Sequence, residues 1–205
     1  MYTVHVNSVH ILPSKARILT AAQELQHATG LDSVSVRNVA AAVALSPSAI
    51  YRHYRDKDAL LDAMAEEGFL VFEAYLTRAV AESAKPKRLR AIIDAYLRFA
   101  LEHPSDYEVM FLTPRAGLRR FPADFSATQS RTFAILRDSV DLAMRSEELR
   151  TDDPRDTALT IWAHAHGLVT MFRVGRFGDD PERFRVLYHR SFDRILRGLR
   201  KPRAK

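Results

Sequence analysis

Apolar residues recur every three or four positions along most of the chain, which is the spacing of amphipathic α-helices. Glycines, prolines and short polar residues separate the apolar stretches, at places where helices commonly begin and end. The pattern therefore predicts an all-α chain of about nine helices. We expect these helices at about residues 15–29, 36–43, from 47 onward, 58–84, 87–103, 104–113, 125–145, 154–174 and 181–199.

Two of the expected helices lie between residues 35 and 57 and are short, with a tight break between them. Ser35 precedes the first, and its hydroxyl oxygen can accept a hydrogen bond from a free amide of the first turn. Ser46 precedes the second, where Pro47 suits the first helical position because proline lacks only an amide that would be unpaired there. The segment is therefore predicted to be a helix-turn-helix.

The second of these helices has an inward and an outward face. Ile50 and Tyr54 are four residues apart and can pack on the preceding helix. A recognition helix contacts base edges in the major groove mainly with its N-terminal residues, while flanking groups bind phosphates. The outward positions hold polar, aromatic and basic side chains that suit this function: Ser48, Tyr51, Arg52 and Arg55.

The run VAAAVALSPSAIYRHYRDKDALLDAMA resembles the DNA-binding domain of TetR-family transcriptional regulators. The resemblance rests on the Ser46 cap, the aromatic pair Tyr51 and Tyr54, and Lys57 followed by two leucines. It implies that the start of the second helix faces bases and that neighbouring side chains bind backbone phosphates without reading sequence. The base-facing residues would be Pro47, Ser48 and Ala49, with Arg52 reaching a base or a phosphate; Tyr51, His53 and Lys57 would bind phosphates; and Arg37, Asn38 and Ser46 complete the DNA-binding candidates.

Ala44 departs from the family pattern, which usually has glycine in the turn. Alanine tolerates a positive φ poorly because of its Cβ. Either the turn stays right-handed here, or it is slightly strained.

A second run, ALTIWAHAHGLVTMF, resembles the C-terminal domain of one branch of TetR-like regulators that is named for a Trp-His-Gly pattern, here Trp162, His166 and Gly167. Such regulators are similar to one another in forming twofold dimers through their last two long helices, and the wide apolar stripes near the C-terminus suit this role. A homodimer would place two DNA-binding domains about one DNA turn apart, roughly 34 to 36 Å, on a near-palindromic operator.

The larger domain carries aromatic and polar residues that could line a mostly apolar pocket with a few polar handles. The resemblance implies a small-molecule effector there. Packing in the core is the alternative for each of these side chains, because an apolar stripe at helical spacing normally faces the interior. The candidates are Tyr96, Phe99, Tyr107, Met110, Phe111, Phe133, Trp162 and His166.

The length of 205 residues suits a small DNA-reading domain and a larger helical domain. We expect an N-terminal arm at 1–12, a helix-turn-helix domain at 13–57, a regulatory and dimerisation domain at 58–200 and a basic tail at 201–205. The formal net charge of +6 lies largely near the C-terminus. A nucleic-acid contact and a solvated helix end that suits its own dipole both fit that charge.

Several classes of protein are excluded by composition. The chain has no cysteine, so it can form neither disulfides nor thiolate zinc sites. Its apolar runs are shorter than the ~18 residues typical of a membrane span. The N-terminal stretch lacks the basic start and sustained apolar run of a signal peptide, so a cytoplasmic protein without membrane contact is expected.

Two alternatives to a ligand-controlled regulator stay open. A metal-dependent helical enzyme would be built around His164 and His166, but side chains two residues apart on a helix point about 200° from each other and cannot share one metal. No nucleophile and base can be paired, so no catalytic residue, metal or cofactor is predicted. An architectural DNA-binding protein without a ligand needs the same helix-turn-helix. The sequence thus predicts a sequence-specific DNA-binding regulator, which by resemblance is a repressor released by a small, largely apolar ligand.

Overall fold

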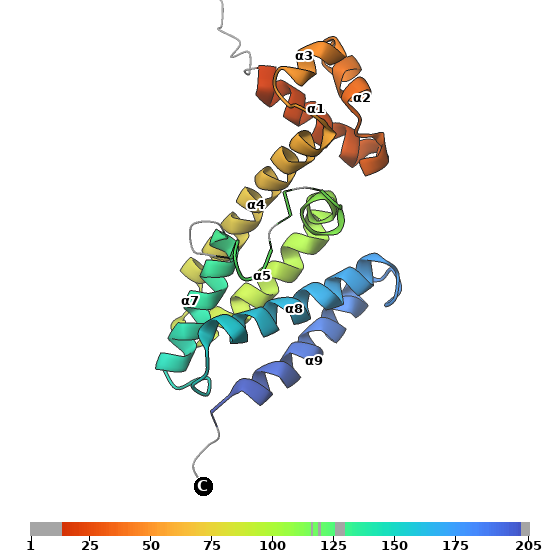
Figure 1. Ribbon diagram of the computed structural model, residues 1–205. Coiled ribbons are helices and arrows are strands. Elements are labelled where there is room, and N and C mark those ends of the chain that lie inside the picture. Colours follow the sequence, from red (N-terminus) through yellow and green to blue (C-terminus); the bar gives the residue numbers. More distant parts are fainter. Residues whose placement is uncertain (1–13, 116, 119, 126–129, 202–205) are drawn as a thin grey trace, which may run out of the picture. The chain divides into compact units, whose positions relative to one another are not determined.

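The computed structural model describes residues 14–115, 117–118, 120–125 and 130–201. In these residues all repeating structure is helical, apart from two isolated bridges, which confirms the all-α prediction. No helix among them is long and apolar enough to cross a membrane. The described α-helices are α1 (Ser14–Thr29), α2 (Val36–Ala42), α3 (Pro47–Tyr51), α4 (Lys57–Glu82), α5 (Arg88–Glu102), α6 (Pro104–Tyr107), α7 (Arg131–Arg145), α8 (Pro154–Arg173) and α9 (Pro181–Leu199), as labelled in Figure 1. The predicted arm at 1–12 and all but the first residue of the predicted tail lie outside the described residues.

The described chain forms two compact units. The first part of α4 belongs to the N-terminal unit because Leu60 and Met64 are buried in its core. The division therefore differs from the boundary after residue 57 that we expected from the sequence. The N-terminal unit holds the described residues up to Glu66 together with Glu108–Gly117, and the C-terminal unit holds Glu67–Tyr107 and the described residues from Leu118 on.

The N-terminal unit is a small assembly of helices (Figure 1). One buried apolar cluster lies at its centre. The helix α1 ends at Thr29 and is followed by Gly30, which has a φ of 85° that glycine adopts without strain. The Gly30 amide donates a hydrogen bond to the Gln26 carbonyl at 2.9 Å. The 3-10 turn η1 (Leu31–Ser33) then leads into α2. The buried cluster includes Ile18 and Ala22 of α1, Val39 of α2, Ile50 of α3, Leu60 of α4 and Val109.

In the C-terminal unit, α8 and α9 run side by side (Figure 1). Both helices begin as the sequence predicts, with an aspartate cap and a proline in the first turn. The Asp153 carboxylate accepts hydrogen bonds from the amides of Arg155 and Asp156, and the Asp180 carboxylate accepts from those of Glu182 and Arg183. The side chains that α9 buries recur every fourth residue and pack into the unit: Phe184, Tyr188, Phe192 and Leu196.

Two elements differ from their predicted form. The helix expected from about residue 125 begins at Arg131, and Phe125 is not helical. The helix expected at 104–113 consists of the single turn α6 followed by the π-helical turn η3 (Glu108–Leu112), after which the Thr113 amide donates to the Glu108 carbonyl at 3.1 Å. A π turn places side chains at a spacing other than that of an α-helix, so the apolar period cannot reveal it. A second 3-10 turn, η2 (Lys85–Lys87), joins α4 to α5.

Candidate nucleic-acid interface and buried polar cluster

Two serine caps hold the helix-turn-helix in shape, as the sequence predicts. The Ser35 hydroxyl accepts a hydrogen bond from the Asn38 amide at 3.1 Å at the start of α2. The Ser46 hydroxyl accepts from the Ala49 amide at 3.3 Å at the start of α3, where Pro47 takes the first position. The Ser46 and Ser48 hydroxyls are 2.8 Å apart, so the outer side chain at the helix start is also fixed.

The inward and outward faces of α3 are confirmed for the side chains that define them. Ile50 is fully buried, and Tyr54 is buried with its hydroxyl donating to the Lys15 carbonyl of α1 at 3.3 Å. Tyr51, by contrast, exposes 53% of its surface. The helix itself ends at Tyr51, and Arg52 and His53 follow in a turn in which the Tyr54 amide still donates to the Ile50 carbonyl.

The predicted DNA-binding residues are exposed with one exception. Ala49 is only 7% exposed and packs in the N-terminal unit, so it is not part of the outer face on which the sequence placed it. Asn38 is exposed, but its side-chain amide donates to the Ser33 carbonyl at 2.8 Å and so holds the start of α2. The exposed candidates are Arg37, Asn38, Ser46, Pro47, Ser48, Tyr51, Arg52, His53 and Lys57.

The turn between α2 and α3 could be right-handed or slightly strained at Ala44, and the structure shows the strained form. Ala44 has a φ of 54°, in the left-handed region where a Cβ meets the neighbouring backbone. The Leu45 amide donates to the Ala40 carbonyl at 2.9 Å and closes the turn around it. The turn therefore holds an alanine in a backbone conformation that favours glycine.

A buried arginine, which the sequence gave no reason to single out, fixes the 108–117 segment in the N-terminal unit. The Arg115 side chain is 4% exposed and pairs with Asp62 of α4, its Nη1 lying 2.8 Å from Oδ1. It also donates to the carbonyls of Val109 at 3.2 Å and Met110 at 3.1 Å. The contact joins residues 53 positions apart, and no local pattern signals such a pair.

A cluster of hydroxyl groups around one imidazole lies inside the C-terminal unit. The Tyr107 hydroxyl is 2.8 Å from His166 Nδ1, and the Tyr96 hydroxyl is 3.2 Å from the same atom. The Thr170 hydroxyl lies 3.3 Å from that of Tyr107. Three of the predicted effector residues, Tyr96, Tyr107 and His166, are therefore brought together, and Thr170 is an addition that the sequence did not single out because it lies outside the aromatic pattern.

Burial keeps the members of this cluster neutral. It lowers the pKa of His166, so the imidazole is uncharged near neutral pH and an unprotonated Nδ1 can accept from a tyrosine hydroxyl. Burial also raises the pKa of Tyr96 and that of Tyr107, so both phenols keep their protons. The cluster offers uncharged donors and acceptors in an apolar setting.

Aromatic rings connect this cluster to the other predicted residues of the C-terminal unit. Trp162 stacks on His166 with ring centres 5.3 Å apart, and Phe125 lies between Trp162 and Phe133 at 5.9 and 5.2 Å. On the other side, Phe72 contacts Tyr96 at 5.4 Å and Phe99 at 4.8 Å. Met110 and Phe111 belong to the N-terminal unit and stay predictions as effector contacts.

The two histidines of α8 have different neighbours. His164 Nε2 lies 2.9 Å from the Ser191 hydroxyl of α9, whereas His166 Nδ1 faces the tyrosines. Among the described residues, no three His, Asp or Glu side chains are grouped to hold a metal ion.

Comparison with known proteins matches both units. Residues 18–64 match the family model of bacterial regulatory proteins of the tetR family, and residues 89–199 match that of the tetracyclin repressor-like C-terminal domain. The second description does not specify a Trp-His-Gly type, so that narrower resemblance stays a prediction. The HTH-type transcriptional repressor Rv1474c of Mycobacterium tuberculosis (strain ATCC 25618 / H37Rv) is 37% identical over 62 residues, which are 30% of this chain and 33% of the relative. The chain thus aligns with about a third of that relative's length.

Solved structures resemble the chain over nearly its full length. A protein of unknown function from Rhodococcus sp. RHA1 is 28% identical with a TM-score of 0.73, covering 96% of this chain and 100% of its own. A regulatory protein of the tetR family from Rhodococcus RHA1 is 25% identical with a TM-score of 0.68, over 92% and 98% of the two chains. AibR, at 22% identity and a TM-score of 0.61, covering 85% and 95%, shares the fold. Because the tetracyclin repressor-like model alone matches more than half of the residues, the chain belongs to the tetR family of bacterial regulatory proteins.

Proposed function

We propose that this protein is a transcriptional repressor that binds a near-palindromic DNA operator as a homodimer and is released by a small, largely apolar effector. The observation that carries the proposal is the division of α3 and the turn after it into a buried and an exposed face. Ile50 and Tyr54 fix the backbone from inside, so Tyr51 and Arg52 are presented outward on a rigid support. A rigid helix that exposes hydroxyl groups and is followed at once by basic side chains suits the major groove.

Repression is supported by the relatives. Rv1474c, which is similar to this chain over 62 residues, is a transcriptional repressor. AibR has been crystallised in complex with isovaleryl coenzyme A and operator DNA, so one protein of this fold binds both an acyl thioester and an operator. A protein that acts on DNA in this way would work in the bacterial cytoplasm.

Dimerisation through α8 and α9 is supported by the apolar side chains that these helices expose. Met171 is 46% exposed and Val174 is 63% exposed at the end of α8. A twofold axis beside these helices would cover them in both copies at once. The two α3 helices would then be set about one DNA turn apart, roughly 34 to 36 Å.

The effector is proposed to bind at the hydroxyl cluster of Tyr96, Tyr107, His166 and Thr170. The surrounding rings are apolar, while the hydroxyls and the uncharged imidazole can exchange their mutual hydrogen bonds for bonds to a ligand carbonyl or hydroxyl. A hundredfold loss of operator affinity requires the effector to prefer the released state by roughly 2.8 kcal/mol.

A mobility-shift titration of the full chain tests DNA recognition directly. The probes are the promoter fragment of its own gene and a shuffled fragment of equal length and composition, at fixed salt because several phosphate contacts make affinity steeply salt-dependent. The proposal expects tighter binding to the promoter fragment and a complex of two chains per site. Equal affinity for both fragments would exclude a sequence-specific regulator.

The effector part is tested separately on the operator complex. Isovaleryl coenzyme A and free isovalerate serve as probes of an acyl ligand, with coenzyme A as the matched control for its nucleotide part. Release of the DNA by an acyl compound, lost in Tyr107→Phe, supports the cluster as the effector site. Release that is unchanged in Tyr107→Phe would place the effector elsewhere.

A further inference from the structure

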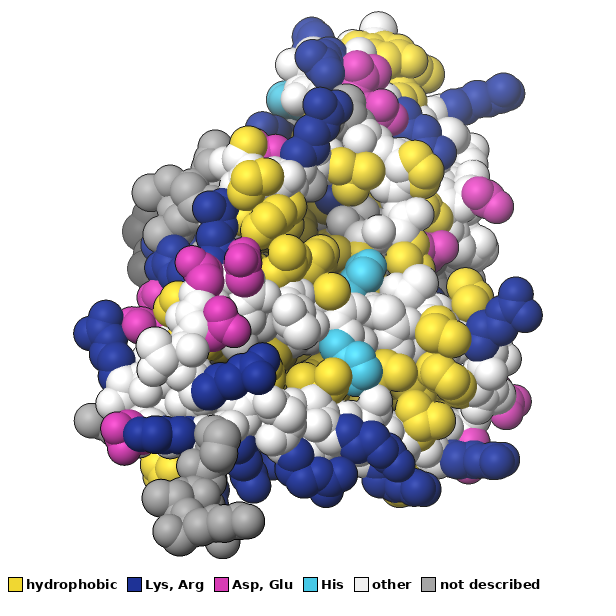
Figure 2. Space-filling view, turned by 60° about the horizontal axis from the view of Figure 1, so that its bottom comes forward, with side chains coloured by type: hydrophobic (Ala, Val, Ile, Leu, Met, Phe, Trp, Pro, Cys, Tyr) yellow, Lys and Arg dark blue, Asp and Glu magenta, His cyan; other side chains and the backbone are white. Residues whose placement is uncertain are grey.

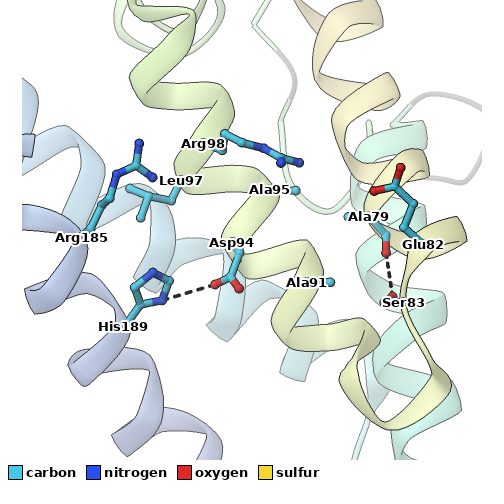
Figure 3. A pocket seen from close by; sticks show the side chains of 10 residues that line it. All are labelled: Ala79, Glu82, Ser83, Ala91, Asp94, Ala95, Leu97, Arg98, Arg185 and His189. Atoms are coloured by element: carbon cyan, nitrogen blue, oxygen red, sulfur yellow. Dashed lines mark hydrogen bonds and ion pairs between the residues drawn. The ribbon is translucent and has the colours of Figure 1, made fainter. Parts of the chain in front are cut away.

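A hollow of about 350 Å³ lies between α4, α5 and α9 in the C-terminal unit (Figure 3). Three of its lining residues are alanines of α4 and α5, whose small side chains leave the space between the helices unfilled. Its lining also carries charged and titratable groups of both signs: Glu82, Asp94, Arg98, Arg185 and His189. We call this space the three-helix hollow.

The side of α9 that lines the hollow is turned toward α5 of the same chain. The Tyr188 hydroxyl donates to the Ile93 carbonyl at 3.1 Å. One turn further along α9, Asp193 pairs with Arg90 of α5. The homodimer proposed above uses the exposed apolar side chains at the end of α8, and most lining residues of the hollow belong to α4 and α5. The hollow is therefore formed by one chain and lies on a different side of α9 from the proposed dimer contact.

Two layers of charged side chains border the hollow, one helical turn apart. In one layer Asp94 of α5 faces His189 of α9, with Oδ1 and Nδ1 3.3 Å apart. Four residues along each helix, the same register places Arg98 level with Arg185, about 6 Å away along the axes. Figure 3 shows both guanidinium groups above Asp94 in that view. One layer thus offers a carboxylate, and the next offers two positive groups.

Asp94 has unused capacity to accept hydrogen bonds. Its Oδ1 is buried and accepts no hydrogen bond from the described residues, although His189 lies at ion-pair distance. Burial raises the pKa of this carboxyl, so its ionised form lacks stabilisation. The other acid of the hollow, Glu82, pairs with Arg78 of its own helix at 2.8 Å. A ligand ammonium group at Asp94 would supply both a donor and a positive charge.

Arg98 is the complementary group for an anion. Its guanidinium carbon lies 5.4 Å from the ring centre of Tyr75, which orients the exposed side chain. In the described part of the chain, Arg98 has no carboxylate at ion-pair distance. Arg185 pairs with Glu182 at 3.0 Å, but the exposed position of that acid makes the pair weak. A ligand carboxylate is therefore attracted to the side of the hollow that Arg98 borders.

The presence of both charges distinguishes the hollow from the basic surface of the chain. Figure 2 shows Lys and Arg side chains following one another along the lower edge of that view. Such a surface attracts anions in general. In the hollow a simple anion would leave Asp94 without a donor, and a simple cation would leave Arg98 without an acceptor.

We propose that the three-helix hollow binds a zwitterionic α-amino acid with an apolar side chain, separately from the effector cluster and from DNA. The ammonium group donates to the Asp94 carboxylate, and the ligand carboxylate accepts from the Arg98 guanidinium. An α-amino acid carries its two charges on neighbouring carbon atoms, so it can contact residues i and i+4 on one helix face. Its side chain lies against Ala91 and Ala95.

A protein-observed NMR titration of the full chain without DNA tests the proposal. The probes are L-norvaline, butylamine, which lacks its carboxylate, and pentanoate, which lacks its ammonium group. We expect norvaline to bind and each part-ligand to bind at least about tenfold more weakly, because each loses one charge-assisted hydrogen bond. Pentanoate that binds as tightly as norvaline, or a norvaline that does not bind, would overturn the proposal.

Two variants assign the two ends of the ligand. Asp94→Asn should weaken norvaline binding by about tenfold or more and leave pentanoate unchanged, whereas Arg98→Gln should weaken norvaline equally and leave butylamine unchanged. Thermal unfolding checks that both variants fold. Because Arg98 is exposed, Arg98→Gln decides the question even where Asp94→Asn is unstable. Loss of norvaline and butylamine binding to the same extent in Arg98→Gln contradicts the assignment.

The matched controls are Asp141→Asn and Arg145→Gln, which remove the same charges from an exposed pair on α7. Each should leave norvaline affinity within about twofold, because general electrostatic attraction is screened at physiological salt. Tyr107→Phe should also leave it unchanged, since a loss there would place the amino acid at the effector cluster and overturn the proposal. DNA binding is not a readout, so failure of this proposal leaves the repressor proposal untouched.

Discussion

The two units differ in where the polar side chains proposed to bind a partner lie. In the N-terminal unit the buried cluster is apolar and the side chains proposed to meet DNA, such as Tyr51 and Arg52, are exposed. In the C-terminal unit the groups proposed to meet the effector, such as the buried hydroxyl of Tyr107 and the partly buried imidazole of His166, lie toward the interior. A substitution can therefore separate stability from function in the first unit, whereas in the second unit the two are carried by the same atoms.

The largest effect that tests this contrast is expected from Ile50→Ala. Ile50 is fully buried, so its truncation should lower the free energy of unfolding of the N-terminal unit by about 2–5 kcal/mol. The neighbouring Tyr51→Ala should change it by about 0.5 kcal/mol or less, because Tyr51 is exposed. Urea unfolding followed by circular dichroism measures both. Comparable losses for the two variants would show that the faces of α3 are wrongly assigned.

Tyr107→Phe should cost about 1–3 kcal/mol of unfolding free energy in the C-terminal unit, because it removes a buried hydroxyl from between His166 and Thr170. The only tryptophan of the chain, Trp162, stacks on His166, so its fluorescence reports this unfolding. Tyr188→Phe is the matched control, since it removes a buried hydroxyl that donates to the Ile93 carbonyl at 3.1 Å. Both variants should lose stability, but only Tyr107→Phe should alter the effector response; an altered response in Tyr188→Phe alone would contradict the site.

Lys57→Ala should weaken binding to all DNA sequences without loss of stability, because Lys57 is exposed at the start of α4 and would contact a phosphate. We expect the slope of log affinity against log salt to fall in magnitude by about one. Arg78→Ala removes the same charge from the C-terminal unit and is the control. Arg52→Ala and Ser48→Ala should instead change the preference among operator variants. An unchanged salt slope in Lys57→Ala would remove Lys57 from the interface.

The stability of the C-terminal unit should fall as the pH drops below about 6.5. Burial lowers the pKa of His166 below its ordinary value of 6.5, so between these two values the unfolded chain binds the proton more readily than the folded one. Stability is then fully present above pH 6.5 and decreases toward the folded-state pKa, by at most about 1.4 kcal/mol per pH unit.

The variant that checks this pH dependence is His166→Gln, in which Trp162-monitored unfolding should show a flatter pH profile than in the wild type. His164→Gln is the comparison, because burial lowers the pKa of His164 as well but that imidazole faces Ser191 on α9. If the two variants flatten the profile equally, His166 has no special part in the pH response.

The smallest effect is expected from Ala44→Gly. Removing the Cβ at a φ of 54° relieves a left-handed strain, against the entropy that glycine adds to the unfolded chain, so a net gain of up to about 1 kcal/mol is expected. Ala41→Gly, at an exposed helical position near the end of α2, should instead cost up to about 1 kcal/mol. Thermal unfolding of the pair gives the sign directly. A loss in both would mean that the turn is not strained.

Local rules were enough to predict most of the helices and the helix-turn-helix. Ser35, Ser46, Asp153 and Asp180 act through bonds to amides two or three residues away, and such contacts are visible in the sequence. The burial of Ala49 was missed because a small side chain gives no clear sign of its face at the start of a short helix.

Long-range contacts explain what the sequence did not reveal. The Arg115–Asp62 pair and the approach of Thr170 to Tyr107 join residues more than 50 positions apart, so no periodicity announces them. Asp193 of α9 pairs with Arg90 of α5, which is a further contact that no local pattern signals.

The inclusion of residues 108–117 in the N-terminal unit has a practical consequence for exchanging parts between related regulators. A reading head cut from the chain at Glu66 would leave behind Val109, which is fully buried in its core, and Arg115, which pairs with Asp62. A chimaera joined within α4 would therefore combine the DNA-binding helices of one regulator with the 108–117 segment of another. We expect DNA-binding units of this type to fold in a chimaera only when the 108–117 segment is exchanged together with them.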